Sequence, residues 1–244
     1  MTYYTLQELF QLPDRAGFER EIAAVFSARQ CEKIMRAYRL SKYGHRNQWR
    51  DSGERYFDHP KSLAIAAVRL GVRDPAIIIA LLLHDIREDS HILNRRDIVL
   101  WFGRRADHYI DRVTKDKTDP NFTSEGYFLR LAKDGPGISN AFAQLFGPWA
   151  GQIVRFFLKD HPGSWIAKLI DRLHNLSTLY DNGDPAEHAR FLNKKARQVE
   201  ETRREILPLA QKLSKVFGYE ELGRYLYAEI SALCDQRERE VAAG

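Results

Sequence analysis

The sequence predicts a single all-α domain, and three observations lead to that fold class. Apolar residues recur at steps of three and four through most of the chain, whereas runs that alternate apolar and polar residues are scarce. Short clusters of glycine, proline, aspartate and asparagine separate the periodic stretches. The 244 residues are enough for a sizeable core, and they contain no internal repeat and no long linker.

Helical spacing dominates the N-terminal part of the chain. The stretch 16–42 places apolar side chains at helical steps, and these are Phe18, Ile22, Val25, Phe26, Ile34, Ala37 and Tyr38. A second helix is expected over residues 61–70, with its apolar residues facing inward and with Gly71 ending it.

The most apolar helix is predicted to begin at Asp74-Pro75, because an aspartate cap followed by proline at the first turn is a strong start signal. Its sequence, PAIIIALLLHDIRED, is apolar nearly all round until it reaches a histidine. We therefore expect this helix to be central and buried. A further helix is expected over about residues 95–115.

The second half of the chain continues the helical pattern. Residues 124–133 and 165–179 are predicted helices, and residues 186–240 are expected to form two or three charged amphipathic helices as a C-terminal extension. The stretch 134–164 is apolar and aromatic enough to form a helix pair. It has three open roles: covering a functional site, making a homodimer contact, or packing in the core. Packing is favoured, because apolar helical residues are usually core residues.

Composition and charge narrow the class of protein. The net charge of +5 suits an anionic ligand, but acidic and basic residues are interleaved, unlike the concentrated basic face of a nucleic-acid-binding protein. No apolar run approaches the roughly 20 residues that span a membrane, and the N-terminus has no signal-type segment. Cys31 and Cys234 have no metal or redox spacing. A cytoplasmic protein without nucleic-acid or membrane partners is expected.

Polar residues that could carry chemistry follow the buried helix directly, in the stretch LLLHDIREDS. Taken alone, His84-Asp85 is better explained as a core histidine with an aspartate partner, because such dipeptides are common. Two other positions change that balance. His59-Pro60 precedes a predicted helix, and Asp171 stands beside core-facing positions of another helix, where an unpaired charge costs several kcal/mol.

Two histidines and two aspartates on three helices form a ligand set suited to Mn²⁺, Fe²⁺ or Zn²⁺, with positions left open for water and substrate. Glu88 and Asp89 follow about one helical turn after the His-Asp pair, within reach of a metal-bound water. The alternative is a solvated acidic helix end. Because acids at a helix C-terminus oppose the helix dipole, function explains them better than stability does.

Five segments in order give this sequence a resemblance to a known family. They are HRNQWRDSGERYFDHP (45–60), with His45, Gln48, Arg50, Ser52, Gly53, Glu54, Tyr56, His59 and Pro60 at the positions of the family pattern, LLLHDIREDS (81–90), FGRRADHYIDRVTK (102–115), KLIDRLHNLSTL (168–179) and LPLAQKLS (207–214). Together they resemble the HD-domain hydrolases of the RelA/SpoT alarmone family. The resemblance spans residues 45–214, which is most of the chain.

This resemblance implies an HD-domain helical bundle of about ten helices. It also implies a Mn²⁺-dependent 3′-pyrophosphohydrolase that converts ppGpp or pppGpp to GDP or GTP and pyrophosphate. Nothing similar to the family's synthetase or regulatory domains follows in this sequence, so a stand-alone small alarmone hydrolase is expected.

The roles that the resemblance implies can be assigned position by position. The metal ligands would be His59, His84, Asp85 and Asp171. Glu88 and Asp89 would support the attacking water. Arg50 would pack on the guanine with Ser52 in the same loop, Lys168, Asn175 and Thr178 would lie around the base and ribose, and Lys115, with Arg50 and Lys168, would offset the phosphate charge.

The sequence departs from the family pattern near the expected site. Arg87 lies between the His-Asp pair and Glu88, and Arg55 replaces the proline that is common after Ser-Gly-Glu. These changes leave the base preference open, so adenine alarmones such as ppApp remain candidate substrates. Two further functions are alternatives: another HD-type phosphohydrolase, such as an NADPH 2′-phosphatase, and a non-catalytic nucleotide-binding module. Intact Glu88 and Asp89 speak against the module, because a binding module would not need them.

Replacing Glu88 with glutamine tests the role expected for that acid. Glutamine keeps the shape of the side chain but cannot take a proton from water. The variant should bind Mn²⁺ normally and hydrolyse its substrate more slowly by a factor on the order of 10². Metal titration and steady-state rates measure the two effects. An unchanged rate would mean that Glu88 is only a surface acid.

Overall fold

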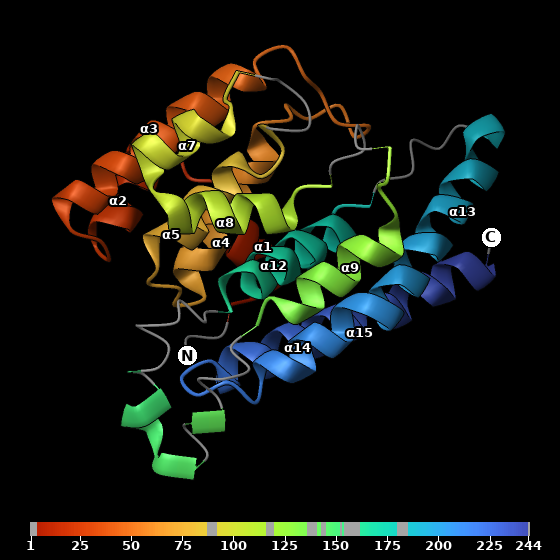
Figure 1. The fold of residues 1–244 in the computed structure, drawn as a ribbon. Coiled ribbons are helices and arrows are strands. Elements are labelled where there is room, and N and C mark those ends of the chain that lie inside the picture. The colour runs from red at the N-terminus through yellow and green to blue at the C-terminus, as the bar shows by residue number, and fades with distance from the viewer. Residues whose placement is uncertain are drawn as a thin grey trace. The chain divides into compact units, whose positions relative to one another are not determined.

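The computed structural model confirms an all-α protein (Figure 1). Within the residues that it describes there is no β-strand, and one isolated bridge joins Trp49 and Arg55. No helix in this part of the chain is long and apolar enough to cross a membrane. The residues described are 4–86, 92–115, 120–135, 141–142, 145–151, 153, 162–179 and 185–243.

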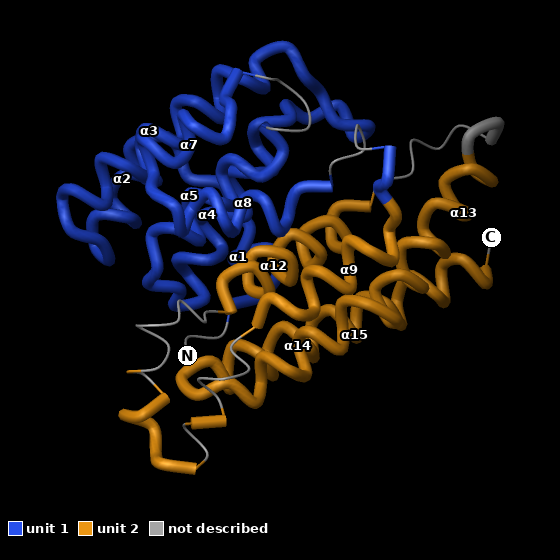
Figure 2. The backbone as a smooth tube through the Cα atoms, viewed as in Figure 1, with its two compact units in different colours: residues 1–122 blue, residues 123–244 orange. Residues whose placement is uncertain are grey.

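The chain divides into two compact units, residues 1–122 and residues 123–244 (Figure 2). Each unit has its own helices and its own buried apolar residues. The expectation of a single domain stays a prediction, and the units are described separately below.

Unit 1 is built around one apolar helix, α5 (Pro75–Leu83), which contacts α3, α4 and α8. Asp74 caps it by accepting a hydrogen bond from the Ala76 N–H at 3.0 Å, and Pro75 occupies its first turn. Every side chain from Ala76 to Leu83 is buried, as predicted for this helix. The other helices of the unit are α1 (Leu6–Phe10), α2 (Arg15–Ala23), α3 (Ala28–Gly44), α4 (Asp58–Arg69), α7 (Arg95–Phe102) and α8 (Arg104–Val113).

Two predicted helices of unit 1 are shorter than the sequence pattern indicates. Helix α5 ends at Leu83, and His84 and Asp85 lie in the turn that follows it. The helix predicted over residues 95–115 is two helices, because Gly103 has a φ of 91° and breaks the α-helical path between α7 and α8. A left-handed φ of this kind is readily adopted only by glycine.

Unit 2 is organised around α12 (Gly163–Ser177), which contacts α9, α14, α15 and the π-helix η1. Thirteen of its 15 residues are buried, among them Lys168, Asp171 and Arg172. The C-terminal part contains three α-helices and one π-helical turn, which agrees with the expected series of amphipathic helices. The elements around α12 are α9 (Ser124–Lys133), α13 (Pro185–Glu201), η1 (Thr202–Ile206), α14 (Leu207–Leu213) and α15 (Glu220–Ala243).

The stretch between α9 and α12 contributes little to the core where it is described. Its large apolar side chains are 41% to 74% exposed, and they are Phe142, Leu145, Phe146, Trp149 and Ile153. Ala150, Gly151 and Pro162 are the buried residues in the described part of this stretch. The packing role favoured from the sequence is therefore not seen for these five side chains.

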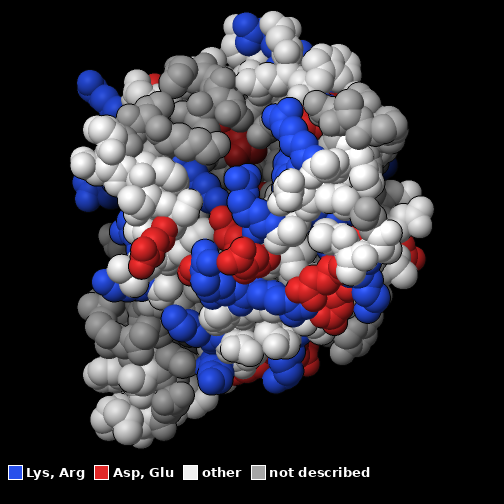
Figure 3. Space-filling view, turned by 90° about the vertical axis from the view of Figure 1, so that its right-hand side faces the viewer, with Lys and Arg blue, Asp and Glu red and all other residues white. Residues whose placement is uncertain are grey.

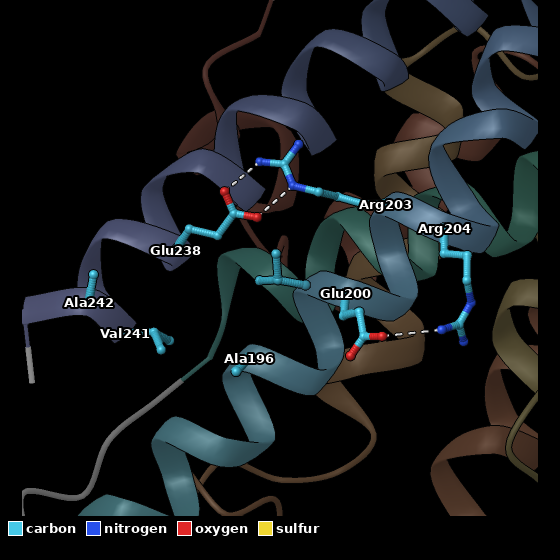
Figure 4. A pocket seen from close by; sticks show the side chains of 8 residues that line it. Ala196, Glu200, Arg203, Arg204, Glu238, Val241 and Ala242 are labelled. Atoms are coloured by element: carbon cyan, nitrogen blue, oxygen red, sulfur yellow. Dashed lines mark hydrogen bonds and ion pairs between the residues drawn. The ribbon is translucent and has the colours of Figure 1, made fainter.

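Charged side chains of both signs are interleaved on the surface, as the sequence predicts. Figure 3 shows lysine and arginine next to aspartate and glutamate over one face of the molecule. Ion pairs also join η1 to α15, because Arg203 binds Glu238 at 2.6 Å (Figure 4). Arg203 binds Asp235 of α15 at 2.6 Å as well. These pairs border a groove of about 590 Å³ whose apolar lining includes Val199 and Val241.

Glu240 anchors the last turns of α15 to α13. Its carboxylate accepts hydrogen bonds from Lys195 and Arg237, each at 2.8 Å, and the Lys195 side chain is buried. Burial by itself would raise the pKa of Glu240, but hydrogen bonds from Arg237, Lys195 and Gln236 outweigh it and lower the pKa from 4.5 to about 2. The folded state therefore favours the charged carboxylate.

This shift predicts how stability depends on pH. A lowered pKa in the folded state stabilises the protein above pH 4.5, and the contribution is lost as the pH falls from about 4.5 toward 2. Because about a third of the Glu240 side chain is exposed and solvent screens the pair, we expect Glu240→Gln to lower the free energy of unfolding by about 1 kcal/mol at pH 7. The difference from wild type should shrink at pH 3, as measured by denaturant unfolding. Glu229→Gln on the same helix is the control. If the difference in unfolding free energy between wild type and Glu240→Gln did not change with pH, the prediction would be contradicted.

Candidate metal site

Two histidines of unit 1 present ring nitrogens to one point. His59 lies in the first turn of α4 and is 5% exposed, and His84 follows the last residue of α5. One ligand nitrogen of each ring lies within 4.8 Å of the other, and the ring centroids are 5.4 Å apart. Two buried imidazoles at this separation can ligate one metal ion.

Asp85 adds a carboxylate to the same point. Its Oδ2 atom lies 3.1 Å from Nε2 of His84 and 4.0 Å from Nε2 of His59. His59, His84 and Asp85 are called the His-Asp cluster below. Because these two ring nitrogens and one carboxylate oxygen converge, the cluster offers a mixed nitrogen and oxygen ligand set of the kind that binds divalent transition metals.

The hydrogen bond at the other nitrogen of His84 tests whether the cluster fits a metal. Nδ1 lies 2.9 Å from the carbonyl oxygen of Leu81, which can only accept, so Nδ1 carries a proton. Nε2 then faces the Asp85 carboxylate at 3.1 Å. A lone pair and a carboxylate oxygen repel each other at that distance unless a proton or a metal ion lies between them. The Nδ1 bond is also the arrangement that orients metal-ligating histidines.

The backbone of His84 is held by the end of another helix. Thr114 follows α8 and is buried, and its hydroxyl is shared between two carbonyl acceptors, Ile110 at 2.7 Å and His84 at 3.1 Å. The Val-Thr-Lys segment that contributed to the family resemblance therefore supports the cluster through Thr114. Lys115, predicted to offset phosphate charge, is the next residue and is half-buried.

Arg50 and Ser52 lie in a tight turn between α3 and α4. The N–H of Arg50 donates to the Glu54 carbonyl at 2.9 Å, and the N–H of Gly53 donates to the Arg50 carbonyl at 2.9 Å. Gly53 has a φ of 80°, which suits glycine at the tip of the turn. Arg50 and Ser52 are both half-buried. The turn thus brings together the two residues predicted to meet the base.

In unit 2, Asp171 lies within a polar cluster on the buried face of α12. Lys168 and Asn175 stand one turn before and after it, and the three residues are called the Asp171 cluster below. Lys168 Nζ lies 2.8 Å from Asp171 Oδ2, and Asn175 donates to Oδ1 at 2.6 Å. Both oxygens of this buried carboxylate are therefore hydrogen-bonded, which offsets the cost of its burial.

The ion pair decides the charge of Lys168. Burial favours the neutral amine, but the Asp171 carboxylate outweighs it and raises the pKa of Lys168 above its ordinary value. The ammonium also lies 5.8 Å from the centroid of the Tyr127 ring, within the range of a cation–π contact. Thr178, just after α12, donates its hydroxyl to the His174 carbonyl at 2.9 Å.

One contact of the His-Asp cluster was not predicted from the sequence, and three residues predicted near it are not among those described. Glu88, Asp89 and Arg87 lie outside the described residues. The unanticipated contact is the Tyr56 hydroxyl, which donates to Asp85 Oδ2 at 3.0 Å. Tyr56 belongs to the same motif as His59, but its bond to Asp85 spans 29 positions and has no local sequence signal.

The Asp171 cluster predicts a measurable cost for losing its lysine. Lys168→Met keeps the length of the side chain but leaves Asp171 as a buried carboxylate without its cation. The metal-free protein should lose about 3 kcal/mol of unfolding free energy, measured with denaturant. Lys212→Met, at an exposed position of α14, is the matched control. Equal stability of both variants would show that the pair contributes nothing.

Several curated proteins are similar in sequence to part of this chain. No family model matches it. It is 30% identical over 183 residues to "Probable GTP pyrophosphokinase" of Mycobacterium leprae. The aligned region covers 74% of this chain and 19% of that protein. It is 30% identical over 182 residues to "Bifunctional (p)ppGpp synthase/hydrolase RelA" of Mycobacterium tuberculosis, which covers 74% and 20%.

A hydrolase is also among the relatives. "Guanosine-3′,5′-bis(diphosphate) 3′-pyrophosphohydrolase" of Aquifex aeolicus is 40% identical over 84 residues, which are 34% of this chain and 12% of that protein. The chain thus spans about a fifth or less of the length of these curated relatives.

One solved structure shares the fold. It is described as "A metazoan ortholog of SpoT hydrolyzes ppGpp and plays a role in starvation responses", and it matches with a TM-score of 0.56 at 19% identity, over 87% of this chain and 97% of that one. At this identity the likeness concerns the fold alone. Sequence and fold together confirm the resemblance predicted from the motifs: the chain is related to RelA/SpoT-type proteins over about three quarters of its length.

Proposed function

We propose that the protein is a metal-dependent 3′-pyrophosphohydrolase of alarmone nucleotides, which converts ppGpp or pppGpp to GDP or GTP and pyrophosphate. The observation that carries the proposal is the His-Asp cluster, in which His84 Nε2 faces Asp85 Oδ2 at 3.1 Å while its Nδ1 is occupied by Leu81. Relatives named for alarmone hydrolysis, such as the Aquifex aeolicus protein, support the choice of substrate class.

Asp171 is proposed as the fourth ligand of the metal, together with His59, His84 and Asp85. The family resemblance of KLIDRLHNLSTL supports this assignment. The local chemistry supports it as well, because Asp171 is a buried carboxylate held in one orientation by Lys168 and Asn175. A set of two imidazoles and two carboxylates suits Mn²⁺, and Mn²⁺ is the ion that the resemblance implies.

The reaction would proceed by attack of water on the phosphorus joined to the ribose 3′ oxygen. The bond between that phosphorus and the 3′ oxygen breaks, the oxygen takes a proton, and pyrophosphate leaves. When bound, a divalent ion lowers the pKa of its coordinated water toward neutrality. Glu88 and Asp89 would orient this water and accept its proton. Lys168 and Lys115 would balance charge on the phosphates.

The Arg50 turn would hold the base of the nucleotide. A planar guanidinium can stack on a purine ring, and Ser52 in the same turn supplies a hydroxyl. Stacking by arginine does not discriminate guanine from adenine, so ppApp is retained as a second substrate to test. Asn175 and Thr178 would lie near the base and ribose. A nucleotide substrate and free thiols at Cys31 and Cys234 favour the cytoplasm as the location.

A product assay tests the proposed function directly. Purified protein with Mn²⁺ is incubated separately with ppGpp, ppApp and NADPH, and the products are separated by ion-exchange chromatography. GDP and pyrophosphate from ppGpp are expected, and the ppApp rate measures base preference. Phosphate released from NADPH would instead identify a 2′-phosphatase. Metal binding without any turnover would point to a non-catalytic nucleotide-binding module.

Asp171→Asn tests the fourth ligand. The amide keeps the size of the side chain and can still contact Asn175, but it lacks the charge that a divalent cation needs. We expect Mn²⁺ affinity to fall by at least 10²-fold and ppGpp hydrolysis to fall below detection, because a buried charged ligand is removed. Calorimetric titration and the product assay measure both effects. Asp235→Asn on α15 is the control, and wild-type metal affinity in Asp171→Asn would refute the assignment.

A further inference from the structure

One side chain reaches the His-Asp cluster from the turn that carries Arg50 and Ser52. Tyr56 stands just before α4, and its hydroxyl donates to Asp85 Oδ2 at 3.0 Å. The two residues are 29 positions apart in the sequence, so this bond ties the loop to the turn that ends α5. Oδ2 is also the Asp85 oxygen nearest to both histidine Nε2 atoms.

The Tyr56 ring is held on more than one side. The His45 ring stacks on it, with centroids 4.6 Å apart and an interplanar angle of 26°, and His59 meets it edge-on at 6.4 Å. His45 is 2% exposed, and its Nδ1 lies 2.5 Å from Gln48 Oε1. These contacts leave the ring little freedom to turn, so the direction of the Tyr56 hydroxyl is set by its surroundings.

The backbone joins Tyr56 to the same tight turn. The Tyr56 N–H donates to the Gln48 carbonyl at 3.0 Å. The next hydrogen bond toward the tip of the turn runs from the Arg50 N–H to the Glu54 carbonyl. Tyr56 therefore stands at the base of the turn, while Arg50 and Ser52 stand near its tip. A movement of the turn would displace the Tyr56 hydroxyl and, through it, the Asp85 carboxylate.

We propose that Tyr56 is a positioning residue that fixes the Asp85 carboxylate for metal binding and couples the metal site to the Arg50–Ser52 turn. The inference rests on the proposed function for the presence of the metal. A carboxylate can rotate about its Cβ–Cγ bond, and a hydrogen bond to one oxygen selects one orientation. Loss of such a partner commonly weakens metal affinity about 10- to 100-fold.

Tyr56→Phe removes only the hydroxyl, and its first readout is metal binding without substrate. Metal-free protein is titrated with Mn²⁺ by calorimetry, and affinity should fall about 10- to 100-fold. Tyr43→Phe is the matched control, because Tyr43 is 57% exposed and its hydroxyl has no hydrogen bond in the described part of unit 1. The melting temperature of the metal-free variant is measured alongside. Wild-type Mn²⁺ affinity in Tyr56→Phe, whatever its melting temperature, would overturn the inference.

Coupling to the turn is tested by a double-mutant cycle with Gly53→Ala. Alanine at a φ of 80° strains the turn but meets no other atom within 4 Å. We expect Gly53→Ala to weaken Mn²⁺ binding in the presence of Tyr56 and to have little further effect in the Tyr56→Phe background. Equal losses in both backgrounds would overturn the coupling.

Kinetics separate this inference from the proposed function. With saturating Mn²⁺, Tyr56→Phe should recover most of its kcat for ppGpp, because the defect lies in holding the metal. If the wild type bound Mn²⁺ and Tyr56→Phe bound it more weakly, while neither cleaved ppGpp, the positioning role would stand and the alarmone hydrolase would fail. If the wild type cleaved ppGpp and Tyr56→Phe bound Mn²⁺ normally, the alarmone hydrolase would stand and the positioning role of Tyr56 would fail.

Discussion

The close approach of His84 Nε2 to Asp85 Oδ2 is the contact on which the rest of the candidate metal site depends. The Leu81 carbonyl occupies the other nitrogen of the ring, so the space between Nε2 and the carboxylate must hold positive charge. A proton can supply it, and so can a metal ion. Because His59 Nε2 lies 4.0 Å from the same carboxylate oxygen, the arrangement has the donor atoms of a metal site rather than of a simple ion pair.

The apolar helix α5 positions this contact, and hydrogen bonds offset the free-energy cost of burying its polar groups. Its eight consecutive buried residues, Ala76 to Leu83, place His84 at the boundary between the core and the polar groups that follow. Thr114 then satisfies the His84 carbonyl, and Tyr56 satisfies the Asp85 carboxylate. Polar groups at the end of a buried helix are tolerated because each has a partner. In unit 2, the buried carboxylate of Asp171 likewise has hydrogen-bond partners, which are Lys168 and Asn175.

Much of the fold could be predicted from local patterns, but element ends could not. Asp74-Pro75 and the apolar run after it specify the start and burial of α5, whereas its end depends on tertiary contacts such as Thr114 with His84. The break at Gly103 was readable in principle, because an isolated glycine interrupts the pattern of residues 95–115. The π-helical turn η1 has no comparable sequence signal. Apolar spacing also predicted burial for the stretch 134–164, where the described aromatic side chains are exposed.

For the candidate site, the ligand residues could be predicted from the sequence, whereas their hydrogen-bond partners could not. Histidines and aspartates in metal-ligand combinations identified His59, His84 and Asp85 before any distance was known, and the structure brings these three together. The spacing of Lys168, Asp171 and Asn175 places them on one face of a helix, as observed. Which partner each ligand would use was not predictable, because Tyr56 and Thr114 reach the cluster from other elements of unit 1.

Anomalous X-ray diffraction from Mn²⁺-loaded crystals, recorded at the manganese absorption edge, directly locates the proposed metal ion. We expect one strong peak within bonding distance of Nε2 of His59, Nε2 of His84 and carboxylate oxygens of Asp85 and Asp171. A crystal in which Mn²⁺ bound elsewhere, with His84 still paired directly to Asp85, would contradict this expectation.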